Sequence, residues 1–244
     1  CVKLKKIINL FRSEIFINMD QQVKHLSIIM DGNRRWAKSH GLPSFEGHRA
    51  GYKKIDEVLR WCRDAGVKTL TLFAFSTENW QRAKEEVYFL MGLFYRAFTE
   101  DIKKLHENNI RVLLIGRKEG LSKKLQGAIL QAEELTKNND GCTLNLAINY
   151  GGRPELMDAF KKILKNPPAE ITEETISQNL YTAEQANPDL IIRTSGEQRL
   201  SGFLTWQSAY SELLFVNHHW PEFSKDDFDG ALTDFAARQR RFGK

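Results

Sequence analysis

The feature that most constrains the fold of this chain is a regular alternation of strand-like and helix-like segments from residue 25 onward. Short runs of β-branched and other apolar residues predict strands, whereas apolar residues at i, i+3 and i+4 predict helices. The predicted strands are 26–30, 67–75, 111–115, 143–148, 190–192 and 213–216, and the predicted helices are 52–64, 87–105, 121–136, 154–164 and 224–238. This order predicts one α/β domain with a central, mostly parallel six-stranded sheet flanked by helices.

Composition limits the class of protein further. The chain has 244 residues, of which 41% are hydrophobic, enough for a sizeable core. No run approaches the roughly 18 apolar residues that a membrane span needs, so we expect a soluble protein. The net charge of +5 suits an anionic partner, although charge alone does not separate nucleic acid, phosphate and an anionic membrane surface. Cys1, Cys62 and Cys142 form no CxxC pair, which argues against a disulfide scaffold or a zinc site and suits a reducing compartment.

Residues 1–24 form a basic, amphipathic extension that differs from the rest of the chain. It mixes lysines with isoleucines and phenylalanines, and it begins with Cys rather than Met, which suggests that an upstream segment is missing. Three interpretations stay open: a helix on a membrane surface or over an apolar opening, the remnant of a targeting segment, and a helix packed on its own domain.

Polar clusters follow four of the predicted strands. They are residues 31–36 (DGNRRW), 76–80 (STENW), 149–153 (NYGGR) and 193–199 (RTSGEQR). Because ligands of parallel sheets bind beyond the carboxyl ends of the strands, we expect these clusters to converge on one edge. Asp31 is a hard oxygen ligand suited to Mg²⁺, and arginines present forked donors suited to phosphate oxygens. The first cluster therefore predicts a site for a metal diphosphate; the alternative is a solvated turn with a surface ion pair.

Other familiar site signatures are absent or explained by structure. The sequence has no G-x-G-x-x-G after the first strand and no P-loop, which argues against a dinucleotide or P-loop nucleotide site. Residues 226–229 (DDFD) miss the DDxxD spacing and, after Ser224, are typical of a helix N-terminus. His218 and His219 have no partner at ligand spacing, so a structural role is favoured. The positive charge alone does not indicate nucleic-acid binding, which needs a basic face with stacking aromatics.

Six segments in order resemble the cis-prenyltransferases, the undecaprenyl diphosphate synthase family. They are HLSIIMDGNRRWAK (25–38), GHRAG (47–51), FAFSTENW (73–80), NYGGR (149–153), DLIIRTSGEQRLSGFLTWQSAYSELLF (189–215) and WPEF (220–223). The resemblance covers residues 25–244 and implies one catalytic domain with a hydrophobic tunnel between helices, usually in a homodimer. It implies an enzyme that uses Mg²⁺ to join isopentenyl diphosphate to an allylic diphosphate and leaves a cis double bond.

The resemblance also implies roles for individual residues. Asp31 would be the principal catalytic residue and a Mg²⁺ ligand, Glu212 would belong to the metal site, and Ser76 and Asn79 would lie near the proton that leaves C2 of the isopentenyl unit. The implied substrate-binding residues are Gly32, Asn33, Arg34, Arg35, Trp36, His48, Thr77, Glu78, Trp80, Arg82, Arg193, Arg199, Leu200, Ser201, Arg241 and Gly243, with Glu197 orienting the arginines. Trp36 and Trp80 would wall the site or be ordinary core aromatics. Arg241 and Gly243 resemble a tail that reaches into a partner subunit.

Three departures from the family pattern bear on the product. Ser44 stands where bacterial relatives carry Arg, Arg34 stands where they carry Gly, and residues 201–207 read SGFLTWQ instead of SNFLLWQ. The first and last departures argue against ordinary long-chain elongation. Some plant members make short products, and a few join two dimethylallyl units in a lavandulyl-type coupling. A plant-like member with a trimmed targeting segment would be plastidic; otherwise we expect a cytoplasmic protein.

Two further expectations follow. Non-catalytic partner subunits of the family lose the first-motif aspartate, so the intact Asp31 favours an enzyme. The apolar stripe of the helix 87–105 includes Phe94 and Phe98, which in a tunnel would stop growth early and predict a short product; the alternative is plain core packing.

Overall fold

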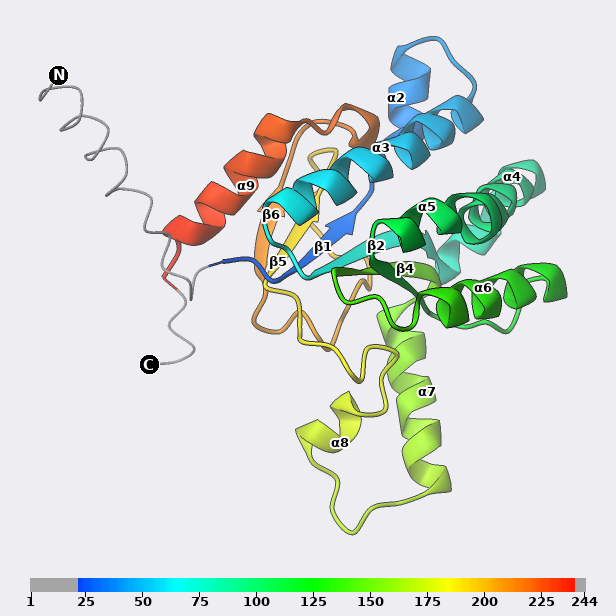
Figure 1. The fold of residues 1–244 in the computed structure, drawn as a ribbon, viewed down its shortest axis with the longest axis vertical. Coiled ribbons are helices and arrows are strands. Elements are labelled where there is room, and N and C mark those ends of the chain that lie inside the picture. The colour runs from blue at the N-terminus through cyan, green and yellow to red at the C-terminus, as the bar shows by residue number, and fades with distance from the viewer. Residues whose placement is uncertain (1–21, 240–244) are drawn as a thin grey trace, which may run out of the picture.

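The structure is a computed structural model that describes residues 22–239 (Figure 1). Residues 1–21 of the predicted extension, and with them its three interpretations, lie outside the described residues, as do Arg241 and Gly243. Within residues 22–239 no helix combines the length and apolar character needed to cross a bilayer. The described chain forms one α/β unit built on a single six-stranded sheet, as the alternation predicts.

The sheet is parallel throughout its described pairings, with strand order β3-β4-β2-β1-β5-β6. Its strands are β1 (His25–Ile29), β2 (Thr69–Ser76), β3 (Ile110–Ile115), β4 (Cys142–Tyr150), β5 (Leu190–Arg193) and β6 (Glu212–Phe215). The chain order reverses direction beside β1, because β2 lies on one side of it and β5 on the other. This is a switch point of the kind at which open parallel sheets bind ligands.

The helices are α2 (Asn33–Ser39), α3 (Ser44–Asp64), α4 (Lys84–Arg96), α5 (Ile102–Glu107), α6 (Lys123–Thr136), α7 (Gly152–Lys165), α8 (Glu173–Ser177) and α9 (Lys225–Ala237). Figure 1 shows α3, α5 and α9 over one side of the sheet and α7 and α8 on the other. The larger core lies between the sheet and α3, α4, α5, α6 and α9. A smaller core packs the opposite face under the turns of residues 201–210.

Alternation along the strands produces these two cores. Ile28 belongs to the larger core and Ile29 to the smaller one, and Ile192 and Ile191 are divided in the same way. The pattern shifts in β2, where Leu72 and Phe75 both face the larger core because the register is irregular around residues 73–76. Such bulges redirect side chains near functional sites, and this one immediately precedes the polar cluster of residues 76–80.

Four features differ from the sequence prediction. Helix α3 begins at Ser44 instead of 52, because the two glycines of GHRAG are tolerated where helices cross closely. The polar segment after β1 contains α2, and α8 was also not predicted. The predicted helix 87–105 is α4 and α5 joined by a π-helical turn, Ala97–Asp101. Such single turns lie inside longer helices, and the i, i+3 and i+4 pattern of the flanking residues does not reveal them.

Candidate active site

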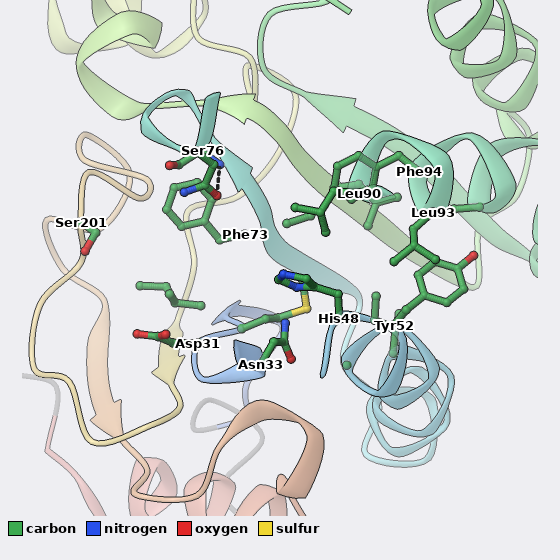
Figure 2. Close-up of a pocket in the computed structure, with 18 of the residues that line it drawn as sticks. Asp31, Asn33, His48, Tyr52, Phe73, Ser76, Leu90, Leu93, Phe94 and Ser201 are labelled. Atoms are coloured by element: carbon green, nitrogen blue, oxygen red, sulfur yellow. Dashed lines mark hydrogen bonds between the residues drawn. The ribbon is translucent and has the colours of Figure 1, made fainter. Parts of the chain in front are cut away.

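A cavity of about 1280 Å³ opens beyond the carboxyl ends of β1, β2 and β5 and continues under α3, α4 and α5. Its two ends differ in character (Figure 2). One end carries Asp31, Ser76 and Ser201, and the other carries the apolar side chains of Leu90, Leu93 and Phe94. The four predicted clusters therefore meet, since residues from each of them line this one cavity.

Asp31 is held at the polar end by two arginines. Arg193 donates from its guanidinium to Asp31 Oδ2 at 2.8 Å, and Arg35 lies 3.1 Å from Asp31 Oδ1. Burial alone would raise the pKa of this carboxyl, but the hydrogen bonds and charges of Arg193 and Arg35 outweigh it and lower the pKa. Asp31 is therefore ionised at neutral pH. Its backbone is fixed as well, because its amide donates to Thr194 Oγ1 and its carbonyl accepts from Trp220.

Three glycines bring the helices close to Asp31. Gly32 has φ of 100°, and a Cβ there would lie 2.6 Å from Ser195 Oγ. On α3, a Cβ at Gly47 would come within 1.9 Å of the Asn33 carbonyl oxygen, and one at Gly51 within 2.3 Å of Asn33 Oδ1. Only glycine lets α3 cross the start of α2 at this distance. The N-terminus of α2 therefore lies at the mouth of the cavity.

A carboxylate that sequence reasoning missed organises the cationic side of the cavity. Glu86 of α4 contacts His48 Nε2 at 2.9 Å, accepts from Arg82 at 3.0 Å and lies 3.7 Å from Arg34. Burial would raise the Glu86 pKa, but these neighbours lower it, and burial lowers the pKa of His48 despite Glu86. His48 is therefore neutral at neutral pH. Glu86 does not itself line the cavity. Next to Glu85 in the first turn of α4, it looks in the sequence like an ordinary acid of a helix N-terminus.

The loop after β2 is anchored from both ends. Asn79 Oδ1 accepts from the Ser76 amide at 3.1 Å, and both residues line the cavity. Trp80 donates from its indole nitrogen to Asn149 Oδ1 at 2.8 Å, and Asn149 in turn donates to the carbonyls of Arg117 and Glu119. Asn149 of the NYGGR segment therefore clamps this loop to the end of β3.

The loop after β5 surrounds the buried Arg193. Besides Asp31, Arg193 donates to the Arg199 carbonyl at 2.5 Å and to Ser201 Oγ at 2.9 Å. The more exposed Arg199 pairs with Glu197, which also lies 3.1 Å from Arg35. Glu197 therefore connects Arg35 of the first polar cluster with Arg199 of the last; that it orients the arginines for a substrate stays a prediction.

The structure places several predicted residues away from the cavity surface. Trp36 packs against His40 in a tilted arrangement, with ring centroids 4.5 Å apart, and the Thr77 hydroxyl donates to the Glu78 carboxylate. Trp36, Thr77 and Trp80 do not line the cavity. Ser44 is exposed at the start of α3 and does not line it either. The remaining predicted substrate residues within the described part do line it: Gly32, Asn33, Arg34, Arg35, His48, Glu78, Arg82, Arg193, Arg199, Leu200 and Ser201.

Glu212 does not join Asp31 within one chain. It begins β6, at the amino end of the sheet, and pairs in register with Leu190, whereas Asp31 follows the carboxyl end of β1. Its carboxylate accepts from Arg238 at 2.7 Å. A metal site that combines Asp31 and Glu212 of the same chain is therefore wrong, because the length of the strands separates them.

The residues around Asp31 nevertheless fit one mode of Mg²⁺ binding, in which substrate phosphates supply part of the ligands. Within residues 22–239 no cluster of three or more His, Cys, Asp or Glu side chains is arranged to hold a metal ion. Mg²⁺, however, is often bound by one or two carboxylates together with substrate phosphates and water. Asp31 is ionised and lies among arginines that can hold a diphosphate. The site therefore suits a magnesium ion that arrives with its diphosphate.

Of the two phenylalanines expected to block the tunnel, Phe94 lines the cavity and Phe98 does not. Phe94 lines the cavity and packs edge-on against Phe75, but Phe98 is buried in the core and does not line it. The prediction that Phe98 blocks the tunnel is wrong, because the π-helical turn that carries it packs against α6 and buries Phe98 in the larger core. The cavity continues past Phe94 to Leu105 of α5 and Val112 of β3.

An α/β sheet whose strand ends carry arginines and an ionised aspartate, above a long apolar cavity, defines a protein that binds the diphosphate of a hydrocarbon chain. Comparison with known proteins identifies the family. The model described as "Putative undecaprenyl diphosphate synthase" matches residues 29–243, and this chain belongs to that prenyltransferase family. The predicted resemblance is therefore confirmed.

Three similar proteins illustrate the family. An isoprenyl transferase of Thermotoga maritima is 50% identical over 224 residues, covering 90% of this chain and 96% of that protein. A tritrans,polycis-undecaprenyl-diphosphate synthase (geranylgeranyl-diphosphate specific) of Methanocaldococcus jannaschii is 50% identical over 238 residues, with coverage of 93% and 85%. The solved structure of lavandulyl diphosphate synthase from Lavandula x intermedia in complex with dimethylallyl diphosphate has a TM-score of 0.88 at 37% identity and covers 92% of this chain and 100% of that one.

Proposed function

We propose that this enzyme joins isopentenyl diphosphate to an allylic diphosphate and repeats the condensation to build a polyprenyl diphosphate. The observation that carries this proposal is the two-ended cavity, in which a cationic mouth around Asp31 continues into an apolar interior. A diphosphate at the mouth would place its hydrocarbon chain in that interior. The coarser activity, prenyl transfer, follows from the family.

The residues at the mouth support the bond-breaking step. When an allylic C1–O bond breaks, negative charge develops on the departing diphosphate, and fixed donors stabilise it most when they are already in place. The departing diphosphate would be held by Arg34, Arg35 and the amides at the start of α2. Glu86 keeps Arg34 and Arg82 in position. Mg²⁺ bound by Asp31 would neutralise part of that charge.

The second diphosphate fits the loop after β5. Arg193, Arg199 and Ser201 lie side by side at the cavity mouth and would bind the isopentenyl diphosphate. The new bond joins C4 of this unit to the allylic C1, and a proton then leaves C2. Ser76 and Asn79 lie nearby in the lining, but neither is a strong base. A diphosphate oxygen is the stronger acceptor, and Asn79 would orient the unit that loses the proton.

We propose a long product, in place of the short one expected from the sequence. The cavity of about 1280 Å³ exceeds the 300–1,000 Å³ typical of small-molecule sites and does not close at Phe94. The Methanocaldococcus relative, an undecaprenyl-diphosphate synthase, supports prenyl chain synthesis of this kind.

The test is an incubation with Mg²⁺, labelled isopentenyl diphosphate and dimethylallyl, geranyl, farnesyl or geranylgeranyl diphosphate, followed by separation of the products by length. We expect chains of many isoprene units and no product after Mg²⁺ is chelated. Absence of product with every primer, while a known synthase in parallel is active, would contradict the proposed function.

A second candidate reaction is favoured by one observation, the TM-score of 0.88 with lavandulyl diphosphate synthase. That reaction would couple two dimethylallyl diphosphates and would need no isopentenyl diphosphate. Incubation with dimethylallyl diphosphate alone distinguishes the two reactions. Regular elongation gives no product there, because it requires isopentenyl diphosphate.

We also propose a homodimer. Met157, Phe160 and Leu164 form an exposed apolar stripe along α7, at spacings that place them on one face. Exposed apolar patches of this kind are typical of association surfaces. An association with membrane surfaces, in contrast, was predicted from residues 1–24 and stays a prediction.

A further inference from the structure

Asn149, at the carboxyl end of β4, has a buried side chain that bonds two different loops. Its amide nitrogen donates to the carbonyls of Arg117 and Glu119 at 3.0 and 2.9 Å, and its amide oxygen accepts from the Trp80 indole at 2.8 Å. Because carbonyls only accept and an indole only donates, these partners fix which end of the amide is the oxygen. The backbone of Asn149 has φ of 52°, a left-handed conformation that asparagine adopts more readily than most residues. Asn149 therefore joins the loop after β3 to the loop after β2.

The contact with Trp80 belongs to the turn that carries Asn79. Trp80 does not line the cavity, so its indole nitrogen serves the contact with Asn149. A Cβ at Gly151 would lie 2.8 Å from the Thr77 hydroxyl, so the turn also packs against the residue that follows β4. Residues on both sides of Asn79 in the sequence are thus held against the end of β4.

Asn79 lines the cavity with its amide oxygen already occupied. That oxygen accepts from the Ser76 backbone amide at 3.1 Å, and among the described residues the Asn79 amide nitrogen has no hydrogen-bond partner. An amide nitrogen donates hydrogen bonds and does not accept a proton. Asn79 is therefore suited to holding a diphosphate oxygen and not to acting as the base.

We propose that Asn149 is a positioning residue for the loss of the proton from the isopentenyl unit, and that it acts through Trp80 on Asn79. The inference rests on the proposed function. In that reaction the allylic C1–O bond breaks, and the electrons of the isopentenyl C3–C4 double bond form the new bond from C4 to the allylic C1, which leaves positive charge at C3. The C2–H bond then breaks, its electron pair forms the C2–C3 double bond, and the proton passes to a diphosphate oxygen. Asn79 would donate to a diphosphate oxygen and so set the distance between the C2 hydrogen and its acceptor.

Loss of the Asn149 side chain should slow proton loss more than it weakens substrate binding. The arginines that would bind the two diphosphates lie mainly in the loops after β1 and β5, whereas the side chain of Asn149 bonds the loops after β2 and β3. A misplacement of about 1 Å at a reacting group can cost on the order of a hundredfold in rate. Glycine also adopts the left-handed backbone, so Asn149→Gly removes the three hydrogen bonds without straining φ. We expect this variant to lower kcat about tenfold or more, with a smaller change in KM.

The test measures the single-turnover rate with isopentenyl diphosphate that carries deuterium at C2, with enzyme in excess over this substrate. If proton loss has become rate-limiting, the isotope effect is larger in Asn149→Gly than in the unmodified enzyme. Trp80→Phe removes the indole donor and keeps an aromatic ring against Phe75, so it should give the same result and carries the test if Asn149→Gly does not fold. The double variant should be no slower than the slower single variant, because both changes break the same contact.

Asn109, directly before β3, offers a matched control. It also has a left-handed backbone, with φ of 58°, and its side chain bonds Asp140, but it does not line the cavity. Asn109→Gly therefore removes comparable hydrogen bonds and should change thermal stability without changing the isotope effect. A readout that needs no turnover is the NMR signal of the Trp80 indole N–H, assigned by its loss in Trp80→Phe. This signal should shift in Asn149→Gly and stay in place in Asn109→Gly.

The outcomes separate this inference from the proposed function. An unmodified enzyme that makes no prenyl product overturns the proposed function. An active enzyme overturns the positioning role alone if the folded Asn149→Gly variant, or Trp80→Phe in its place, keeps the original kcat and isotope effect. Losses that add in the double variant would also overturn it, because the two residues would then act separately. An equal rise of the isotope effect in Asn109→Gly would do the same, since general loosening of the fold would explain it.

Discussion

At the scale of single residues, the site is a network in which carboxylates fix arginines before any ligand arrives. Asp31 is bonded by Arg193 and Arg35, Glu86 by Arg82, and Glu197 lies between Arg35 and Arg199. Each arginine keeps further donors that a carboxylate does not use. A diphosphate can therefore enter without the arginines having to be ordered first, which lowers the entropic cost of binding.

We predict that Asp31→Asn lowers kcat at least tenfold, a loss of about 1.4 kcal/mol of transition-state stabilisation or more. The amide keeps the shape of the side chain but removes the charge that balances Arg193 and that would hold Mg²⁺ in the proposed reaction. Steady-state kinetics with saturating substrates measures this. Asp158→Asn, which removes the partner of Arg117 away from the cavity, should retain kcat. Near wild-type kcat in Asp31→Asn would exclude a catalytic role for this carboxylate.

Glu86→Gln should raise KM for the allylic substrate by several-fold with a smaller effect on kcat. The change releases Arg34, Arg82 and His48 from their common partner but touches no reacting atom. The more conservative Glu86→Asp should restore part of the loss if positioning is the cause. If KM is unaffected in both variants, Glu86 does not organise this side of the site.

His25 gives a pH-dependent contribution to stability. Burial is the largest influence on its pKa and lowers it from the ordinary 6.5, against the effects of the Ala186 carbonyl and Asp189. As pH falls below about 6.5, the unfolded chain binds a proton that the folded chain binds only at lower pH. The free energy of unfolding should therefore decrease on acidification, by at most about 1.4 kcal/mol per pH unit for this group.

Denaturant unfolding between pH 7.5 and 5.5 checks this effect. Gln can replace His25 as donor to the Ala186 carbonyl and as partner of Thr71, so His25→Gln should show a weaker loss on acidification. The exposed His40, changed to Gln, is the matched control and should leave the pH dependence unchanged. Identical slopes in all three proteins would assign the pH dependence to other groups.

At the scale of elements, two glycines determine how α3 crosses α2. Gly47→Ala should destabilise the fold and raise KM for the allylic substrate, because its Cβ would collide with the Asn33 backbone. Gly127 of α6 has open space around its Cβ position, so Gly127→Ala should instead raise the free energy of unfolding by about 0.5–1 kcal/mol. Thermal melts and steady-state kinetics of both variants measure this contrast. A stabilised Gly47→Ala would contradict the close crossing.

The elements also show how much the sequence could reveal. Strand positions and the convergence of the polar clusters followed from local patterns, since a parallel sheet brings strand ends together whatever the details. The start of α3 at Ser44 did not follow, because the tolerance of Gly47 and Gly51 depends on a partner helix. Glu86 did not follow either, because two of its three partners, Arg34 and His48, are distant from it in the sequence. The position of Phe98 depends on a π-helical turn that leaves no periodic trace.

At the scale of the whole molecule, the two faces of the sheet have different tasks. The face under α3, α4 and α5 encloses the cavity, whereas the opposite face is covered by a smaller core and by α7. A surface for a second chain on the α7 side would leave the cavity wall free to enclose a growing product. The two ends of the sheet differ as well. Asp31 lies beyond the carboxyl ends of the strands, where the cavity opens, whereas Glu212 lies at the amino end of the sheet.

We predict that the exposed apolar stripe of α7 is the dimer interface. Phe160→Glu places a charge in the middle of the stripe formed with Met157 and Leu164, and burying that charge in an apolar interface is unfavourable. A stable dimer typically buries about 800 Å² per partner, so this one change should move the equilibrium toward monomer. Light scattering coupled to size-exclusion chromatography measures the mass of each species. Tyr88→Glu, at the most exposed aromatic of α4, is the matched control and should leave the dimer intact. A monomeric unmodified protein, or a dimer unaffected by Phe160→Glu, would show that α7 is not the interface.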